Sequence, residues 1–112
     1  MKMKKITAVI REEAAQTILD LLAQIGMQNA TVSEVTAVGP QANDPDSSKL
    51  DITLGRLSKK MLKLEFFTPE EYLQRVVAIV LSGADTNRAG DGVLSVTEVT
   101  DLYRINKRQK LT

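Results

Sequence analysis

The chain has 112 residues, with 15 basic and 14 acidic side chains and a formal net charge of +1. This length suits one domain with a modest core, and a composition of 43% hydrophobic and 26% charged residues excludes wholesale disorder. The near-neutral charge gives no general electrostatic case for nucleic acid as the main partner. The sequence contains no cysteine or histidine, which excludes disulfides, zinc sites built on either residue, thiolate nucleophiles and imidazole bases.

The sequence also indicates where the protein works and whether it is a catalyst. No apolar run approaches the ~20 residues that a membrane-spanning helix needs, and the N-terminus Met1-Lys2-Met3-Lys4-Lys5 leads into a strand-like segment rather than a signal peptide. We therefore expect a cytoplasmic protein. The lack of imidazole and thiolate groups favours a binder or regulator over a catalyst.

The first part of the chain predicts a strand, a helix and a second strand. Residues 4–10 are apolar and β-branched, which favours a strand. Gly26 is placed to end the helix that follows, because glycine tolerates the left-handed conformation of a C-terminal cap. Residues 30–38 alternate well and predict the second strand. The helix has one apolar face, made of Ala14, Ala15, Ile18, Leu21, Leu22 and Ile25.

A long polar segment separates these elements from a second set. Gly39 to Arg56 is turn-rich and predicts no regular element; such a loop is either functional or a tolerated surface insertion. Residues 61–67 predict a third strand. Thr68-Pro69-Glu70-Glu71 then predicts a helix start, with Thr68 as the cap and Glu71 as its reciprocal acceptor. The buried stripe of this helix is Leu73, Val76, Val77 and Val80.

The last part of the chain predicts a loop, a strand and a tail. Gly83 to Gly92 is polar, and residues 93–99 predict the fourth strand. The tail is expected to be a mobile end, with four positive charges and no companion acid: Arg104, Lys107, Arg108 and Lys110.

The element order is strand-helix-strand, loop, strand-helix-strand. A weak echo between residues 32–36 (Val-Ser-Glu-Val-Thr) and residues 96–100 (Val-Thr-Glu-Val-Thr) supports two related halves. We predict an α+β, ferredoxin-like βαββαβ fold in a single domain, residues 1–112, with a four-stranded antiparallel sheet and two helices on one face. The third strand shows apolar residues on both faces, which favours burial of the open face by oligomerisation: Leu62, Leu64, Phe66 and Phe67.

The most pointed motif is Arg88-Ala-Gly-Asp-Gly92, just before the fourth strand. Glycines let the backbone approach a ligand closely, and successive amides in such a turn can hold an anion. Arg104 is a candidate phosphate-binding guanidinium. The alternatives are an everyday turn and a solvated tail arginine.

The order and spacing of several stretches resemble the PII signal-transduction family. The stretches are residues 5–11 (Lys-Ile-Thr-Ala-Val-Ile-Arg), residues 25–35 (Ile-Gly-Met-Gln-Asn-Ala-Thr-Val-Ser-Glu-Val), residues 63–65 (Lys-Leu-Glu) and, most closely, residues 86–92 (Thr-Asn-Arg-Ala-Gly-Asp-Gly). The resemblance implies a compact homotrimer that binds adenine nucleotides in clefts between subunits. It also implies a long loop that docks onto a protein partner, such as a membrane transporter, a metabolic enzyme or a transcription regulator.

The resemblance assigns roles to segments and residues. Residues 39–56 become the effector loop, residues 83–92 the nucleotide-binding loop and residues 104–112 a basic tail. Gly39 and Gln41 match the start of the effector loop, where the family glutamine helps to bind magnesium and 2-oxoglutarate. The other implied positions are Gly90, Asp91 and Gly92 for the phosphates, Arg88 and Arg104 as charges, Thr31 and Phe67 for the adenine, and Val9, Ala37, Val38 and Glu65 for the adjoining pocket.

Three departures from the family pattern alter the expected ligand. Pro40, Val93 and Asn106 stand where the family has cations that bind phosphate. A charged hydrogen bond contributes on the order of 1.5–3 kcal/mol, so their loss weakens triphosphate binding unless lysines such as Lys59 or Lys60 compensate. We expect ADP or AMP, or another small molecule, to be favoured over ATP.

The effector loop offers little for covalent modification. It has no tyrosine, which argues against uridylylation, whereas Ser47 and Ser48 are available for phosphorylation.

Two other functions fit the predicted fold. A small ferredoxin-like enzyme would depend on the carboxylates of Asp91 and Glu65 with Arg88 and Arg104. An RNA-recognition module would need aromatic residues on the open sheet face. Phe66-Phe67 is the sole aromatic pair, and at most one of its rings faces that way.

Overall fold

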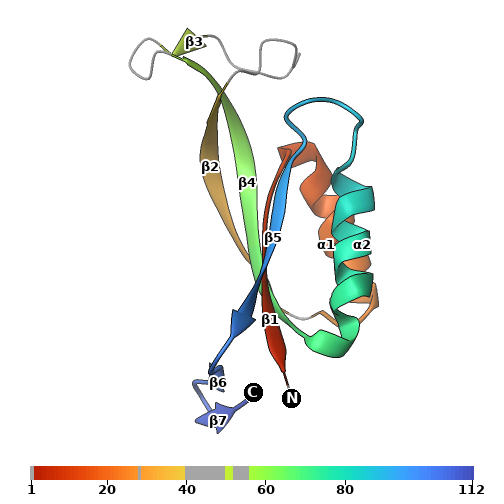
Figure 1. Ribbon diagram of the computed structural model, residues 1–112, viewed down its shortest axis with the longest axis vertical. Helices are drawn as coiled ribbons and strands as arrows, with labels where there is room; N and C mark the ends of the chain where they lie inside the picture. Colours follow the sequence, from red (N-terminus) through yellow and green to blue (C-terminus); the bar gives the residue numbers. More distant parts are fainter. Residues whose placement is uncertain (1, 28, 40–49, 52–55) are drawn as a thin grey trace.

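The computed structural model describes residues 2–27, 29–39, 50–51 and 56–112 (Figure 1). In chain order, the elements of the described chain are β1 (Met3–Ile10), α1 (Glu12–Gln24), β2 (Thr31–Gly39), β3 (Leu50–Asp51), β4 (Arg56–Pro69), the 3₁₀ turn η1 (Glu70–Tyr72), α2 (Leu73–Ala84), β5 (Gly92–Val99), β6 (Tyr103–Arg104) and β7 (Gln109–Lys110). No helix of this described part is long and apolar enough to span a membrane.

One antiparallel sheet organises the chain. The strand order is β2-β4-β1-β5, and short β3 pairs with β4 beyond this path. β1 lies in the centre: Met3 is opposite both Pro69 and Val99, and Ile10 is opposite both Leu62 and Gly92. Both helices cover the same face of the sheet (Figure 1). The predicted ferredoxin-like α+β fold is therefore confirmed.

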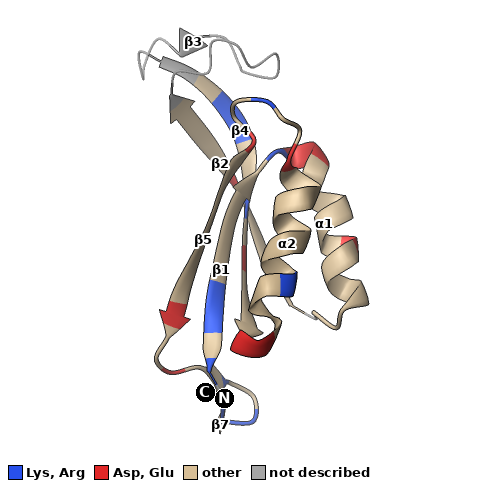
Figure 2. Cartoon of the chain, turned by 45° about the vertical axis from the view of Figure 1, so that its right-hand side comes forward, with Lys and Arg blue, Asp and Glu red and all other residues tan. Residues whose placement is uncertain are grey.

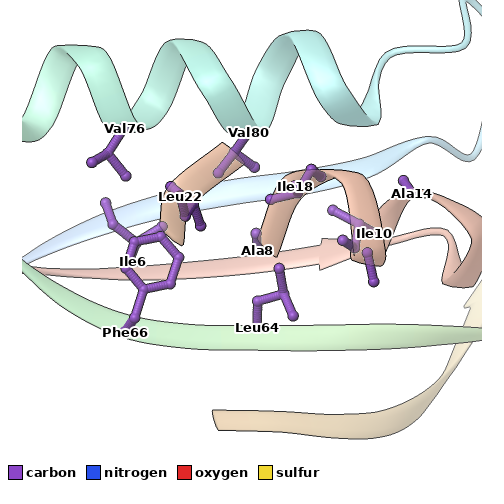
Figure 3. Packing of buried hydrophobic residues seen from close by; sticks show 11 residues of the cluster. Ile6, Ala8, Ile10, Ala14, Ile18, Leu22, Leu64, Phe66, Val76 and Val80 are labelled. Carbon is purple, nitrogen blue, oxygen red and sulfur yellow. The ribbon is translucent and has the colours of Figure 1, made fainter. Parts of the chain in front are cut away.

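The core lies between this sheet face and the two helices (Figure 3). Alternate residues of a strand point to the same face, so the even-numbered residues of β1 reach the helices together. Helical spacing brings the apolar stripes of α1 and α2 onto them. The cluster contains Ile6, Ala8, Ile10, Ala14, Ala15, Ile18, Leu22, Leu64, Phe66, Val76 and Val80.

The open sheet face carries both charged and apolar side chains. Leu62, Leu64 and Phe66 all lie on the helix face because they are two residues apart, and Phe67 alone of that set points the other way, at 41% exposure. The open face carries an ion-pair cluster in which Lys5 Nζ lies 2.9 Å, and Lys63 Nζ 3.7 Å, from the Glu65 carboxylate. β4 therefore carries apolar residues on both faces, as expected, because Met61 and Phe67 share the open face with these charges.

The start of α2 also differs from the prediction. β4 continues to Pro69, and Thr68 is buried with its Oγ1 donating to the Pro69 carbonyl at 3.3 Å, so it does not cap a helix. The chain enters α2 through η1, with no side-chain cap at either start. α2 then continues past Gly83, where an added Cβ would lie 2.6 Å from Ile18 Cγ1. Glycine thus permits the close packing of α2 on α1.

The predicted end of α1 is confirmed. Gly26 has φ +94, and its N–H donates to the Ala23 carbonyl at 3.1 Å. The Met27 N–H donates to the Leu22 carbonyl at 3.0 Å, which completes a Schellman motif.

Two segments predicted to be irregular contain strands. Leu50–Asp51 forms β3 within the 39–56 segment; Pro40, Gln41, Ser47 and Ser48 lie outside the described residues. The tail forms the β6–β7 hairpin, and Lys110 Nζ lies 3.1 Å from the Asp101 carboxylate, so a companion acid is present. The Leu111 N–H donates to the Leu102 carbonyl at 2.7 Å and ties the tail back onto the chain.

A pair of leucine substitutions tests where the core lies. Leu22 is 1% exposed in α1, whereas Leu81 is 55% exposed in α2. Leu22→Ala should lower the free energy of unfolding by about 2–5 kcal/mol, because it removes buried methyl groups and leaves a cavity. Leu81→Ala is the control, with an expected change within about 0.5 kcal/mol. Denaturant unfolding at equal protein concentration measures both, and equal losses would contradict the described packing.

Candidate functional site

The glycine loop, defined as residues 85–92, joins α2 to β5 at the sheet end where β1 finishes and α1 begins (Figure 1). Gly90 has φ +88 and Gly92 has φ +111, conformations that other residues adopt only with strain. An added Cβ on Gly92 would lie 1.8 Å from the Val9 carbonyl oxygen. Glycine is therefore required at position 92 for the loop to join the sheet next to β1.

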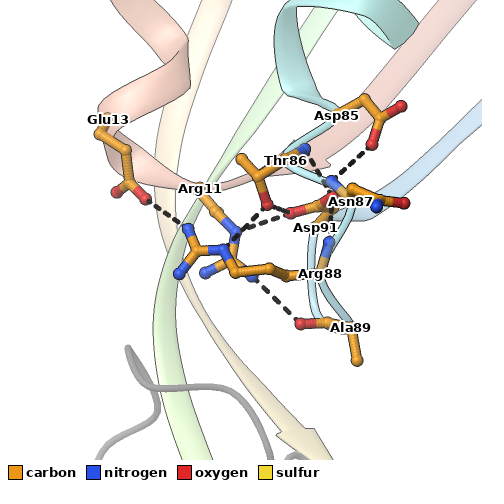
Figure 4. Close-up of polar contacts among 8 residues, drawn as sticks. All are labelled: Arg11, Glu13, Asp85, Thr86, Asn87, Arg88, Ala89 and Asp91. Atoms are coloured by element: carbon orange, nitrogen blue, oxygen red, sulfur yellow. Dashed lines mark hydrogen bonds and ion pairs between the residues drawn. The ribbon is translucent and has the colours of Figure 1, made fainter.

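The carboxylate of Asp91 organises this loop (Figure 4). Oδ2 accepts the backbone N–H of Thr86 at 2.7 Å and that of Arg88 at 3.4 Å. Oδ1 accepts the Thr86 hydroxyl and, at 2.8 Å, the Nε–H of Arg11. The loop thus curls around one carboxylate whose two oxygens both accept hydrogen bonds from the protein itself.

Arg11 is the main residue that sequence reasoning did not place in the site. Its side chain is fully buried at the junction of β1 and α1, with Nε on Asp91 and Nη2 donating to the Ala89 carbonyl at 3.1 Å. The sequence did carry one sign of this role, because Arg11 is a lone cation between an apolar strand and an amphipathic helix. A buried cation needs a partner, but its partner is 80 residues away in sequence.

The electrostatics of Asp91 argue against the enzyme hypothesis. Partial burial alone would raise the pKa of Asp91, but hydrogen bonds from Thr86 and Arg11 outweigh it and hold the pKa well below its usual range. The hydrogen bond from Lys5 likewise lowers the pKa of Glu65. Both carboxylates therefore stay ionised near neutral pH and are poor general acids or bases.

Arg88 lies on the exposed side of the loop. Its Nε donates to the Thr86 hydroxyl at 3.1 Å, and its Nη2 lies 4.0 Å from Glu13 Oε1 at the start of α1. Figure 2 shows this acidic helix start beside the loop. Val9 is opposite Val93, so the structure brings together five of the predicted site residues here: Val9, Arg88, Gly90, Asp91 and Gly92.

The other predicted site residues lie elsewhere in the same chain. Thr31 is opposite Glu65, and its hydroxyl donates to the Glu65 carbonyl at 3.3 Å. Phe67 is opposite Lys5, four residues along β1 from Val9, which is about 13 Å at the strand rise of ~3.3 Å per residue. Ala37, Val38 and Gly39 pair with the beginning of β4 at the other end of β2 from Thr31, and Gln41 lies outside the described residues.

Phe67 and Arg104 share a cavity of about 480 Å³ far from the glycine loop. Its other lining residues include Met27, Asn29 and Tyr72, and most of its wall is apolar. A second cavity of about 350 Å³ lies between α2 and β5, where Asp91 and Gly92 meet apolar side chains. Phe67 and Arg104 thus lie in one part of the chain, and the glycine loop lies in another. Within the described residues, no group of three or more acidic side chains is arranged to hold a metal ion.

Comparison with known proteins identifies the family. The family model "Nitrogen regulatory protein P-II" matches residues 3–109. Nitrogen regulatory protein P-II 1 of Methanothermobacter thermautotrophicus is 36% identical over 104 residues, which are 92% of this chain and 89% of that protein. The chain therefore belongs to the nitrogen regulatory protein P-II family, whose members are signal-transduction regulators.

Solved structures share the fold. Bacillus subtilis GlnK has a TM-score of 0.78 at 21% identity, covering 98% of this chain and 96% of that one. Arabidopsis thaliana PII, solved with bound citrate, has a TM-score of 0.75 at 24% identity, covering 97% and 88%. The predicted family and its regulatory class are confirmed, and nothing in these comparisons supports the enzyme alternative.

Replacing Asp91 tests its role in the loop. Asp91→Asn leaves the buried Arg11 cation without its carboxylate, so the free energy of unfolding at pH 7 should fall by on the order of 3–5 kcal/mol. Glu98→Gln, which removes an exposed ion pair with Lys4, is the control and should cost at most about 1 kcal/mol.

The pH dependence of this loss has a definite sign. The pKa of Asp91 is lowered by folding, so its contribution to stability is present above the ordinary aspartate pKa of ~3.9 and is lost as the pH falls below it. The difference between wild type and Asp91→Asn should therefore shrink on acidification. A difference in unfolding free energy that stays constant from pH 7 to pH 3 would contradict the described network.

Proposed function

We propose that this protein is a homotrimeric sensor of an adenine nucleotide, ADP or AMP in preference to ATP. The nucleotide binds in clefts between subunits, and residues 39–56 act as the effector loop on a protein partner. One observation carries the proposal: the glycine-loop residues expected to bind the phosphates lie about 13 Å along the sheet from Phe67, which is expected to bind the adenine. A second copy that brings its Thr31 and Phe67 to the glycine loop would complete a single site.

The sheet edges support a ring of subunits. β2 and β5 are the two edges of the strand path, and each carries exposed valines, such as Val32 on β2 and Val96 on β5. An exposed apolar edge strand is an aggregation risk unless it is covered. Because the two edges differ in sequence, contact between them is head-to-tail, and such contacts generate closed rings when the rotation allows. Three subunits is the number that the family resemblance implies.

The charge of the cleft supports a nucleotide with fewer phosphates than ATP. Val93 directly follows the glycine loop with its side chain 71% exposed, at a position where the family has a lysine. Arg88 already contacts the Thr86 hydroxyl and lies near Glu13. The loop therefore offers its backbone and one partly engaged guanidinium to an anion, which suits one or two phosphates better than three.

The position of the effector loop supports its proposed role. β2 and β4 carry the two ends of residues 39–56 as a paired ribbon, with Gly39 opposite Leu57. This ribbon rises from the same end of the sheet as the glycine loop (Figure 1). A membrane transporter or a metabolic enzyme is the proposed partner, in the cytoplasm. Within the single domain 1–112, residues 83–92 would bind nucleotide and residues 104–112 would supply a basic tail.

The oligomeric state is the first test. We expect light scattering after size exclusion to give three times the mass of the chain, which is 12.3 kDa, at micromolar concentration. Covering both edge strands and completing the divided site each require neighbouring subunits. A monomer at that concentration would overturn the shared-cleft proposal.

The ligand preference is tested by calorimetry with AMP, ADP, a cyclic nucleotide and ATP. At least one of the first three should bind as tightly as ATP or more tightly. Val93→Lys should then raise the affinity for ATP by roughly 10-fold or more, because a charged hydrogen bond is worth about 1.5–3 kcal/mol. Ser95→Lys, which adds the same charge two residues along β5, is the control. A clear preference of the wild type for ATP with synergy from 2-oxoglutarate would contradict the proposal.

A further inference from the structure

We propose that Arg11 is the positioning residue of the glycine loop: it fixes the shape of the loop before an anion arrives and so sets the affinity for that anion. This inference rests on the proposed nucleotide site. It assigns a role in binding to a side chain that itself touches no ligand, because Arg11 is fully buried behind the loop.

The guanidinium of Arg11 holds the loop at two separate points (Figure 4). Nε donates to Asp91 Oδ1 at 2.8 Å, and Nη2 donates to the Ala89 carbonyl at 3.1 Å. Asp91 in turn accepts the backbone N–H groups of Thr86 and Arg88. One side chain therefore fixes, directly or through Asp91, four positions within the six residues from 86 to 91.

Arg11 is itself held by the core. It directly follows Ile10, which is buried in β1, and its carbonyl accepts the Ala14 N–H at 3.1 Å in the first turn of α1. The second tie from this part of the chain to the loop, between Glu13 and Arg88, is 4.0 Å long and exposed. Exposed ion pairs contribute little, so the buried contacts of Arg11 are the stronger link between core and loop.

The backbone conformation of the glycine loop needs a stabilising contact with the core. Asn87 has φ +58, and Gly90 and Gly92 also have positive φ. Sparsely populated backbone conformations persist only where the surroundings determine them. An anion that binds a pre-formed turn does not have to order it, and the ordering cost would otherwise subtract from its affinity.

The geometry predicts that lysine cannot replace this arginine. The guanidinium is a rigid planar fork with donors in several directions, whereas the ammonium of lysine is a compact charge on a flexible stem. Arg11→Lys therefore keeps a cation near Asp91 but cannot keep both contacts in place. This separates the positioning role from simple charge compensation.

The experiment compares Arg11→Lys with Arg75→Lys, the same change at an exposed position on α2. Hydrogen exchange of the intact assembly without nucleotide reports the loop, and calorimetry with ADP reports its affinity. In Arg11→Lys we expect amides 86–91 to exchange at least about tenfold faster while those of β1 and α2 keep wild-type rates. ADP affinity should fall about tenfold, the equivalent of ~1.4 kcal/mol. Arg75→Lys should match the wild type in both measurements.

Each outcome decides the inference. Unchanged exchange of amides 86–91 in Arg11→Lys would overturn it, and so would faster exchange with unchanged ADP affinity. If the wild type binds no adenine nucleotide, the proposed function is wrong. The part of the inference that concerns anion affinity is then overturned as well. If Arg11→Lys does not fold, Asp91→Glu replaces it, because one added methylene displaces the carboxylate from Arg11 while keeping the charge. For Asp91→Glu we expect the same faster exchange of amides 86–91 and the same loss of ADP affinity.

Discussion

The buried ion pair between Arg11 and Asp91 is the constraint on which the rest of the site depends. A guanidinium is costly to remove from water unless it is paired and hydrogen-bonded, and Arg11 is fully buried. Its position at the end of β1 requires a carboxylate at one point in space, 2.8 Å from Nε. Asp91 meets that requirement only if the loop bends sharply on both sides of it, which accounts for the positive φ of Gly90 and Gly92. An electrostatic requirement of the core thus determines the shape of a surface loop.

The sheet also determines how far apart the proposed binding residues lie. Strand spacing places Phe67 about 13 Å from the glycine loop, and pairing fixes this distance because β1 is central to both β4 and β5. No side-chain rotation closes such a gap. In the proposed site, a cleft between two copies of the chain would use both ends of the sheet together. The open face carries the ion-pair cluster of Lys5 and Lys63 around Glu65 beside the exposed ring of Phe67.

The sequence predicted what depends on local periodicity and left out what depends on contacts between distant residues. Alternation in residues 30–38 predicted β2, helical spacing predicted α1 and its buried face, and Gly26 predicted the end of α1. Arg11 was missed because its partner is 80 residues away. Thr68 carries a good cap signal, but pairing with β1 extends β4 through it and buries its side chain. The tail was misjudged because its hairpin is made by backbone pairing of Tyr103 with Lys110 and Arg104 with Gln109, which composition does not show.

These constraints also limit how such a protein could signal. A ligand shifts a conformational equilibrium only by the difference in its affinity for the two states. The glycine loop and the ribbon of β2 and β4 rise from the same end of the sheet, but the loop is fixed to the core through Arg11 (Figure 1). A rigid loop contributes affinity in both states and therefore cannot select between them by itself. In the proposed mechanism, the glycine loop would bind the phosphate in both states. The contacts that differ between the two states would then come from the ribbon of β2 and β4.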